Sequence, residues 1–220
     1  MARVDAVLFD LDGTLIDSAP DLAGAANDLR QLHGLAPMPY AQLRPMVGTG
    51  ARGMVGQAFG VKPGEAGFEA LRDAFLARYA ERLLLDTVVF ADIEPVLQRL
   101  DALALPWGIV TNKAMRFAQP VVEGLALHQR AATLIGGDST AFAKPHPEPL
   151  FEAARRLGVD PRRCVYVGDD ERDIVAGRAA GMATLAAAWG YLGQGEQIER
   201  WGADAVIENP AQLLNWLELA

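Results

Sequence analysis

Six short runs of apolar residues place the strongest limit on the fold of this 220-residue chain. Each run is only a few residues long and is bounded by Gly, Pro or Asp, which is typical of strands buried on both faces of a parallel sheet. Hydrophobic residues make up 51% of the chain and charged residues 22%, which is a globular composition. The expected strands are Val4–Phe9, Trp107–Val110, Ala132–Ile135, Cys164–Val167, Ala183–Ala187 and Ala205–Ile207.

Helical patterns lie between these runs. In Ile93–Leu103, apolar residues recur at the spacing that places them on one face of a helix. Pro147–Leu157 and Arg172–Ala180 are each followed by a glycine, which commonly ends a helix, and Pro210–Leu219 predicts a last helix. Because strands and helices alternate, the sequence predicts an α/β fold with a Rossmann-like three-layer core and right-handed crossovers.

The alternation is interrupted between about residues 17 and 89, where no strand-like run occurs. An interval of ~70 residues exceeds what surface loops usually hold. We therefore expect a helical subdomain inserted after the first strand, rather than a decoration of the sheet. The predicted division is a catalytic core of residues 1–16 and 90–220 and a helical cap of residues 17–89. The helices expected in the cap are Asp21–His33, Tyr40–Met46, Gly50–Phe59 and Phe68–Leu85.

The charge balance and the single cysteine narrow the choice of partner and compartment. The net charge of −8 would repel a phosphate-rich polymer, so we expect a small metabolite and not a nucleic acid as the partner. Cys164 cannot form an intrachain disulfide, which fits a reducing cytoplasm. No signal peptide is recognised, and no apolar stretch approaches the ~18 residues of a membrane span. We expect a cytoplasmic protein, and monomer and homodimer both stay open.

Acidic residues follow two of the expected strands. Asp10 and Asp12 come after the first strand, and Asp169, Asp170 and Asp173 come after the strand that begins at Cys164. Parallel strands bring their carboxyl ends to one edge of the sheet, where ligands bind. Five acids at one edge repel one another unless a cation lies between them. Oxygen ligands favour a hard metal, and we expect Mg²⁺ held by carboxylates together with substrate phosphate oxygens.

Three further polar residues fit the same edge of the sheet. Thr111 and Asn112 follow the strand Trp107–Val110, and their hydroxyl and amide groups are suitable donors to phosphate oxygens. Lys144 precedes Pro145, a position that does not continue a helix, and it would supply a point charge to phosphate and to a nucleophile. A common turn and a solvated surface lysine are the alternatives for these residues.

Four motifs taken together resemble the haloacid dehalogenase superfamily over nearly the whole chain. They are Asp10-Leu11-Asp12-Gly13-Thr14-Leu15, Val110-Thr111-Asn112, Lys144-Pro145, and Gly168-Asp169-Asp170 with Asp173. The helical insert resembles the C1-type cap of that superfamily, and Val47-Gly48-Thr49-Gly50-Ala51-Arg52 is similar to the cap loop of phosphoglycolate phosphatases. Other stretches, such as Trp107-Gly108-Ile109-Val110-Thr111-Asn112-Lys113, are also similar to N-acetylmuramic acid 6-phosphate phosphatases.

The resemblance implies a mechanism. Asp10 would be the nucleophile that forms an aspartyl-phosphate, and Asp12 would be the general acid and base. Asp10, the backbone carbonyl of Asp12 and Asp169 would hold Mg²⁺, while Asp173 and Asp170 would orient Lys144 or the waters of the metal. Thr111, Asn112 and Lys144 would bind the phosphate in this scheme. Arg52, after the glycine turn of the cap loop, is the candidate to bind a substrate carboxylate.

The resemblance leaves the substrate and the exact reaction open. We favour a phosphatase of the phosphoglycolate type, with N-acetylmuramic acid 6-phosphate or another sugar phosphate as the alternative substrate. A phosphomutase would keep every motif and differ in its cap. A dehalogenase would not need an acid at position 12, and a receiver-type signalling module would lack the large insert. Phe90-Ala91-Asp92-Ile93 departs from the aromatic-Pro-Gly-Val sequence of many relatives.

Overall fold

A six-stranded parallel sheet forms the centre of the protein, whose computed structural model describes residues 4–193, 195 and 197–219. All six predicted strands are present. The first begins two residues later than expected, and the third is limited to its last two residues because only these pair with β4. The strands are β1 (Ala6–Phe9), β4 (Trp107–Val110), β5 (Leu134–Ile135), β6 (Cys164–Gly168), β7 (Ala183–Ala187) and β8 (Ala205–Ile207).

The order of the strands explains where a ligand can bind. Across the sheet the order is β5-β4-β1-β6-β7-β8, so the chain builds outward from β1 on one side and then returns to start β6 on the other. Val7 of β1 is in register with Trp107 on one side and with Val165 on the other. In sheets of this order, ligands bind beyond the carboxyl ends of the strands at the point of reversal. That point lies between β1 and β6.

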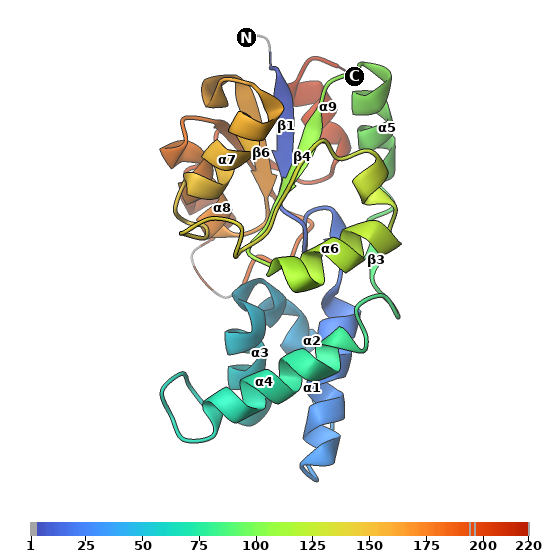
Figure 1. The fold of residues 1–220 in the computed structure, drawn as a ribbon, viewed down its shortest axis with the longest axis vertical. Helices are drawn as coiled ribbons and strands as arrows, with labels where there is room; N and C mark the ends of the chain where they lie inside the picture. Colours follow the sequence, from blue (N-terminus) through green and yellow to red (C-terminus); the bar gives the residue numbers. More distant parts are fainter. Residues whose placement is uncertain (1–3, 194, 196, 220) are drawn as a thin grey trace.

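Helices cover both faces of the sheet, which confirms the predicted three layers (Figure 1). On one face, α5 (Glu94–Ala102), α6 (Met115–Gly124) and α9 (Ala211–Trp216) pack against Val7, Phe9 and their neighbours. On the other face, α7 (Glu148–Leu157) and α8 (Glu171–Ala179) pack against Ala6 and Leu8. Successive residues of β1 thus enter opposite cores, as the alternation of side chains along a strand requires.

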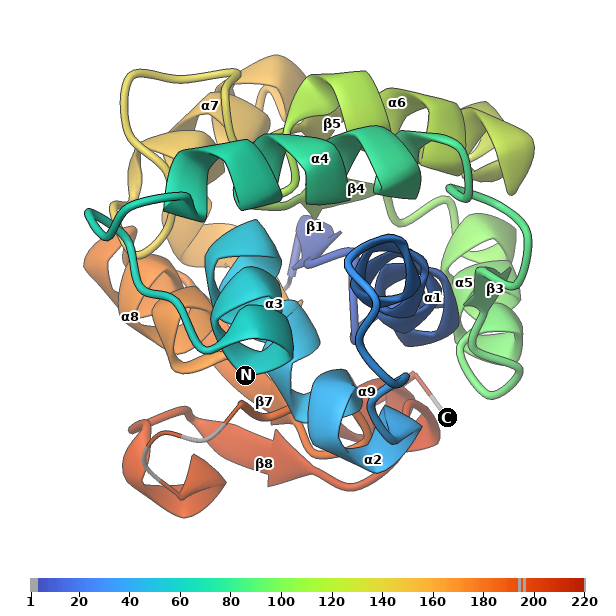
Figure 2. The ribbon, with the colours of Figure 1, turned by 90° about the horizontal axis from the view of Figure 1, so that it is seen from below.

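Four helical segments and a small second sheet make up the interval after β1. They are α1 (Ala19–Leu32), α2 (Tyr40–Leu43) with the 3₁₀ helix η1 (Arg44–Thr49), α3 (Gly50–Phe59), α4 (Phe68–Ala80), and the antiparallel pair β2 (Ile16–Asp17) and β3 (Val88–Val89). Figure 2 views the molecule from the side of these helices and shows α1, α3 and α4 gathered over the end of the sheet. Their apolar side chains form a second hydrophobic core, which also includes Phe117 of α6 and Tyr191. The exact domain boundaries stay a prediction.

The last cap helix is shorter than predicted. The apolar spacing extends to Leu85, but the helix ends at Ala80 and the chain turns. The Asp21 carboxylate, completely buried in α1, accepts hydrogen bonds from the N–H groups of Asp86 and Thr87 and from the Thr87 hydroxyl. These bonds hold the returning chain against the start of α1. None of the described helices has the combination of length and apolar character needed to cross a membrane.

Candidate active site

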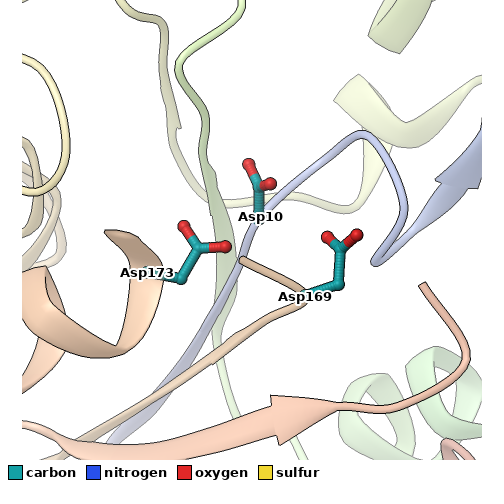
Figure 3. Close-up of side chains that lie close together, drawn as sticks. All are labelled: Asp10, Asp169 and Asp173. Atoms are coloured by element: carbon teal, nitrogen blue, oxygen red, sulfur yellow. The ribbon is translucent and has the colours of Figure 1, made fainter. Parts of the chain in front are cut away.

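Three carboxylates meet at the reversal point of the sheet. Asp10 follows β1, Asp169 follows β6, and Asp173 lies in the first turn of α8. One carboxylate oxygen from each lies within 4.8 Å of the others, and all three side chains are buried (Figure 3). The sequence prediction gave the metal the backbone carbonyl of Asp12 and placed Asp173 behind the metal ligands. The structure brings the carboxylate of Asp173 into the same cluster as those of Asp10 and Asp169.

The chemistry of this cluster fits a divalent cation. Lys144 is the ammonium group that contacts the cluster, so three carboxylates and one ammonium group leave a charge of −2 if all are ionised. Burial, followed by the charges of Asp10 and Asp173, raises the pKa of Asp169 well above its usual range. Burial also raises the pKa of Asp173 to about 7, against the opposing charge of Lys144. A hard cation with oxygen ligands would remove this penalty.

Lys144 occupies the interior of the cluster. Its Nζ atom lies 2.9 Å from Oδ1 of Asp10 and 2.7 Å from Oδ1 of Asp173, and its side chain is only 2% exposed. It also donates to the carbonyl oxygen of Val110 and to the hydroxyl of Tyr166. Burial works against the charge, but Asp10 and Asp173 outweigh it and raise the pKa of Lys144. The ammonium group is therefore charged and fixed beside Asp10.

Asp12 lies apart from the carboxylate cluster and has different partners. Its carboxylate accepts two hydrogen bonds from Nζ of Lys113, at 2.9 and 3.1 Å, and one from the hydroxyl of Ser18. The ammonium group of Lys113 lies 4.6 Å from the centre of the Tyr79 ring on α4. Burial opposes the charge of Lys113, but Asp12 and then Tyr79 raise its pKa. Asp12 is thus held where the sheet meets the cap helices.

The remaining predicted phosphate ligands lie after β4. The hydroxyl of Thr111 is buried and accepts a hydrogen bond from the N–H of Lys113. The side chain of Asn112 makes two hydrogen bonds to the backbone of Lys144: its amide donates to the carbonyl oxygen and its oxygen accepts from the N–H. The Asn112 side chain therefore fixes the Lys144 loop, and Asn112 also lines the cavity described below.

Asp170 has a structural partner in addition to its place near the cluster. It caps the N-terminus of α8 in a capping box with Asp173 and pairs with the guanidinium group of Arg172 at 2.7 Å. Burial acts to raise the pKa of Asp170, but Arg172 lowers it overall. Arg172 also donates to the carbonyl oxygen of Gly48 in the cap loop. This pair therefore connects the core to the cap.

A cavity of about 590 Å³ lies between the sheet and the cap helices. Asp10, Asp12 and Lys144 form its base, and the loop that begins α3 forms part of its wall. Arg52 and Arg116 line the cavity from the cap and from α6, and both side chains are exposed. Within the described ranges, neither guanidinium group pairs with an acidic side chain. The cavity therefore has carboxylates at its floor and guanidinium groups in its walls.

Sequence reasoning missed several side chains that organise the site. Tyr166 lies inside an apolar strand, and its buried hydroxyl is a polar group that must find a partner, which it does in Lys144 and Asp173. Tyr191 donates its N–H to Asp169, and its hydroxyl accepts from the N–H groups of Ser18 and Ala19. Nothing in the local sequence marks Tyr191, because its partners are far away along the chain.

A parallel sheet with a cluster of carboxylates and a lysine at its reversal point, under a helical cap, defines a class of capped α/β hydrolases. The chain belongs to the haloacid dehalogenase-like hydrolases, whose family model matches residues 4–181. A phosphoglycolate phosphatase of Xanthomonas campestris pv. campestris (strain 8004) is 50% identical over 209 residues, which are 94% of each chain. An N-acetylmuramic acid 6-phosphate phosphatase of Pseudomonas aeruginosa is 40% identical over 218 residues, 99% of this chain and 96% of the other.

The solved structures agree with the sequence relatives. A crystal structure described as a predicted phosphoglycolate phosphatase from Haemophilus somnus 129PT matches with a TM-score of 0.86 at 26% identity, covering 98% of this chain and 99% of that one. Sequence and fold relatives thus agree on one family, and the protein is a phosphatase. The relatives described above are named as phosphatases, and none of them as a receiver-type module.

Proposed function

We infer that this phosphatase hydrolyses phosphate monoesters of small acidic metabolites through an aspartyl-phosphate on Asp10, with Mg²⁺ as the cofactor. One observation carries this inference. The carboxylate of Asp10 lies at the end of the central strand, with Lys144 at 2.9 Å and the carboxylates of Asp169 and Asp173 beside it, at the base of a cavity. A nucleophile, fixed positive charge and a cation site thus converge where a phosphate group enters.

In the first step, a carboxylate oxygen of Asp10 attacks the phosphorus atom. The new O–P bond forms as the bond to the ester oxygen breaks, and the electron pair of that bond leaves with the ester oxygen. Asp12 supplies a proton to this oxygen, so the product leaves as an alcohol. Fixed donors around the transferred group hold its charge in place and lower the barrier.

In the second step, water attacks the phosphorus atom of the aspartyl-phosphate. Asp12, now a carboxylate, takes a proton from the water as the O–P bond to Asp10 breaks. The products are inorganic phosphate and free Asp10. Uncatalysed hydrolysis of phosphate monoesters is slow enough that enzymes accelerate it by up to ~10²¹-fold, so the donors of this site must act together.

The residues proposed to hold the metal are Asp10, the backbone carbonyl of Asp12 and Asp169, with Asp173 close enough to contribute an oxygen or to orient a bound water. When bound, Mg²⁺ would balance negative charge on the phosphate oxygens. Phosphate oxygens would also meet Lys144, the Thr111 hydroxyl and the backbone N–H of Asn112. We assign the backbone of Asn112 to this role because its side chain is engaged with Lys144.

Phosphoglycolate is the substrate that we propose first, on the strength of the relative that is 50% identical. The substrate carboxylate requires a cation on the cap side, because the ammonium group of Lys144 is already paired with the carboxylates of Asp10 and Asp173. Arg52 lines the cavity without an acidic partner among the described residues, so its guanidinium group can bind a carboxylate with two parallel hydrogen bonds. In this scheme residues 17–89 act as the cap over a core of residues 1–16 and 90–220.

The volume of the cavity favours a second candidate. At about 590 Å³ the cavity falls within the range of pockets that hold drug-sized ligands, ~300–1,000 Å³. Phosphoglycolate fills little of such a space, whereas N-acetylmuramic acid 6-phosphate, the substrate named for the Pseudomonas aeruginosa relative, fills much more of it. This sugar phosphate also carries a carboxylate, on its lactyl ether, and so makes the same demand on Arg52.

A phosphate-release screen with purified protein and Mg²⁺ tests both candidates by kcat/KM. The panel contains 2-phosphoglycolate, N-acetylmuramic acid 6-phosphate, N-acetylglucosamine 6-phosphate and p-nitrophenyl phosphate. The two amino-sugar phosphates differ in the lactyl carboxylate, so their ratio isolates its contribution. A preference for phosphoglycolate supports the first candidate, and a preference for the muramic acid derivative overturns it. Failure to release free phosphate from any ester would favour a phosphomutase instead.

We also propose a cellular compartment for the protein. A small phosphorylated metabolite as substrate, together with a single buried cysteine kept as a free thiol, supports a cytoplasmic location.

A further inference from the structure

Lys113 is a buried cation that the reaction scheme above does not use. It is one of three lysines in the chain, with Lys62 and Lys144, and it directly follows the predicted phosphate ligands Thr111 and Asn112. Its side chain is only 7% exposed, although it lines the cavity. A lysine at the surface would extend into water, so this burial needs a specific reason.

The contacts of Lys113 converge on a single carboxylate. Its Nζ atom donates to both oxygens of Asp12, at 2.9 and 3.1 Å. This arrangement leaves the Asp12 carboxylate little freedom to rotate. Lys144, the other buried lysine, makes its ion pairs with Asp10 and Asp173 instead. The two lysines therefore pair with different aspartates: Lys144 with the proposed nucleophile Asp10, and Lys113 with the proposed acid and base Asp12.

A cap side chain holds Lys113 in place. The centre of the Tyr79 ring, on α4, lies 4.6 Å from Nζ of Lys113, which is a cation–π distance. Tyr79 is 2% exposed and packs against Phe117 of α6, with ring centres 5.6 Å apart. The ring is thus itself fixed between the cap and the core. The ammonium group is confined on one side by Asp12 and on another by this ring.

We propose that Lys113 is a positioning residue for Asp12, and that Tyr79 holds the lysine in the position that this requires. The proposal rests on the acid and base role inferred for Asp12. Lys113 acts through Asp12 and not on the phosphate, because both oxygens of that carboxylate engage its ammonium group. The orientation of Asp12 then depends on α4 of the cap as well as on the turn after β1 that carries Asp12.

The two half-reactions depend on this positioning to different degrees. Phosphoryl transfer from p-nitrophenyl phosphate to Asp10 expels a leaving group that needs no proton, so it does not require a well-placed Asp12. Attack of water on the aspartyl-phosphate does require Asp12, which must accept the proton. Loss of Lys113 should therefore slow the second half-reaction and spare the first when this aryl ester is the substrate.

The test compares Lys113→Met with the wild-type enzyme on p-nitrophenyl phosphate. We expect kcat to fall about 10- to 100-fold, the scale of a misplaced catalytic group, while kcat/KM stays within about threefold. KM then falls together with kcat, and quenched samples of the variant contain a larger phosphorylated fraction of enzyme at steady state. Lys62→Met, which removes an exposed lysine, is the matched control and should match the wild type in both constants.

Other outcomes would overturn the proposal. An equal loss in kcat and kcat/KM would mean that Lys113 only supports the structure of the site, and a raised KM with kcat unchanged would make it a phosphate ligand. Tyr79→Leu keeps Lys113 but removes the ring, and should lower kcat about three- to tenfold with kcat/KM preserved, so it serves if Lys113→Met does not fold. If the wild-type enzyme forms no phosphorylated intermediate, the proposed function itself fails and this inference falls with it.

Discussion

Replacing Asp169 by Asn should stabilise the metal-free protein while it removes metal binding. Asp169 lies with Asp10 and Asp173 in a buried cluster whose oxygens are within 4.8 Å of one another. At that distance, and at an effective dielectric constant of about 20, each pair of charges repels by about 3.5 kcal/mol. Asn keeps the shape of the side chain. Its oxygen can still accept the N–H of Tyr191, and its amide can donate to the Thr14 hydroxyl, so the local bonds survive.

The Asp169→Asn variant is expected to be more stable than the wild type whether Asp169 stays ionised and is repelled by its neighbours or takes up a proton on folding. In the unfolded chain Asp169 has an ordinary pKa, while in the folded protein burial and the neighbouring carboxylates raise it. A raised carboxylate pKa contributes stability below the unfolded value and loses it as pH rises through the folded value. The folded protein is therefore penalised at neutral pH, and the advantage of the Asp169→Asn variant over the wild type grows as pH rises. Because Lys144 offsets part of the repulsion, we expect a gain of about 1–3 kcal/mol, or about 2–10 °C in Tm.

Thermal unfolding in EDTA and in Mg²⁺ measures this effect. The wild type should gain about 2.7 kcal/mol when Mg²⁺ is near one hundred times its Kd, and Asp169→Asn should gain little. Asp170→Asn is the matched control, because it removes one carboxylate charge at the neighbouring position. The carboxylate of Asp170 is paired with Arg172, so its loss should lower stability by about 1 kcal/mol or less. An Asp169→Asn protein less stable than the wild type in EDTA would refute the reasoning.

Three further results are expected. Arg52→Ala should lower kcat/KM for the carboxylate-bearing substrate about 10- to 150-fold, because a charge-assisted hydrogen bond contributes about 1.5–3 kcal/mol. The variant should hydrolyse p-nitrophenyl phosphate as the wild type does. Equal losses on both substrates would assign Arg52 to the structure of the cap. Gly13→Ala should abolish the Mg²⁺-dependent rise in Tm, because the φ of Gly13 is +87° and a Cβ atom there would lie 2.2 Å from the Asp169 carboxylate; an unchanged rise would contradict this. Burial raises the pKa of the Cys164 thiol to about 11, so iodoacetamide at pH 8 should modify the native protein far more slowly than the urea-unfolded protein, and equal rates would show that the thiol is accessible.

Much of the sheet was predictable because buried strands leave a direct signal in the sequence. Apolar runs bounded by turn residues mark all six strands, and the carboxyl ends of parallel strands necessarily share one edge. This rule alone brought Asp10 and Asp169 together. The helix α6 was not predicted, because Pro120 lies within it and a proline normally interrupts a helical pattern. The strands β2 and β3 hold two residues each, too few to show any alternation.

The partners of individual site residues could not be read from the sequence. Lys113 pairs with Asp12, 101 residues away, and lies over the ring of Tyr79 on α4, and no local pattern encodes either contact. The position of Asn112 after a strand predicted a phosphate donor, but it gave no sign that the side chain bonds to the backbone of Lys144, 32 residues away. Sequence therefore predicts which residue types gather at the sheet edge, while side-chain pairing is decided by contacts between distant segments.

The central claim is that Asp10 carries the phosphoryl group during turnover. Rapid acid quench of the enzyme with its best substrate and Mg²⁺, followed by intact-mass and peptide analysis, measures this directly. We expect a mass increase of one phosphoryl group, located on the peptide that contains Asp10 and absent from Asp10→Asn. Asp12→Asn should still form the adduct from p-nitrophenyl phosphate and release it slowly. A phosphorylated intermediate trapped in Asp10→Asn, or an adduct on another residue, would contradict the account.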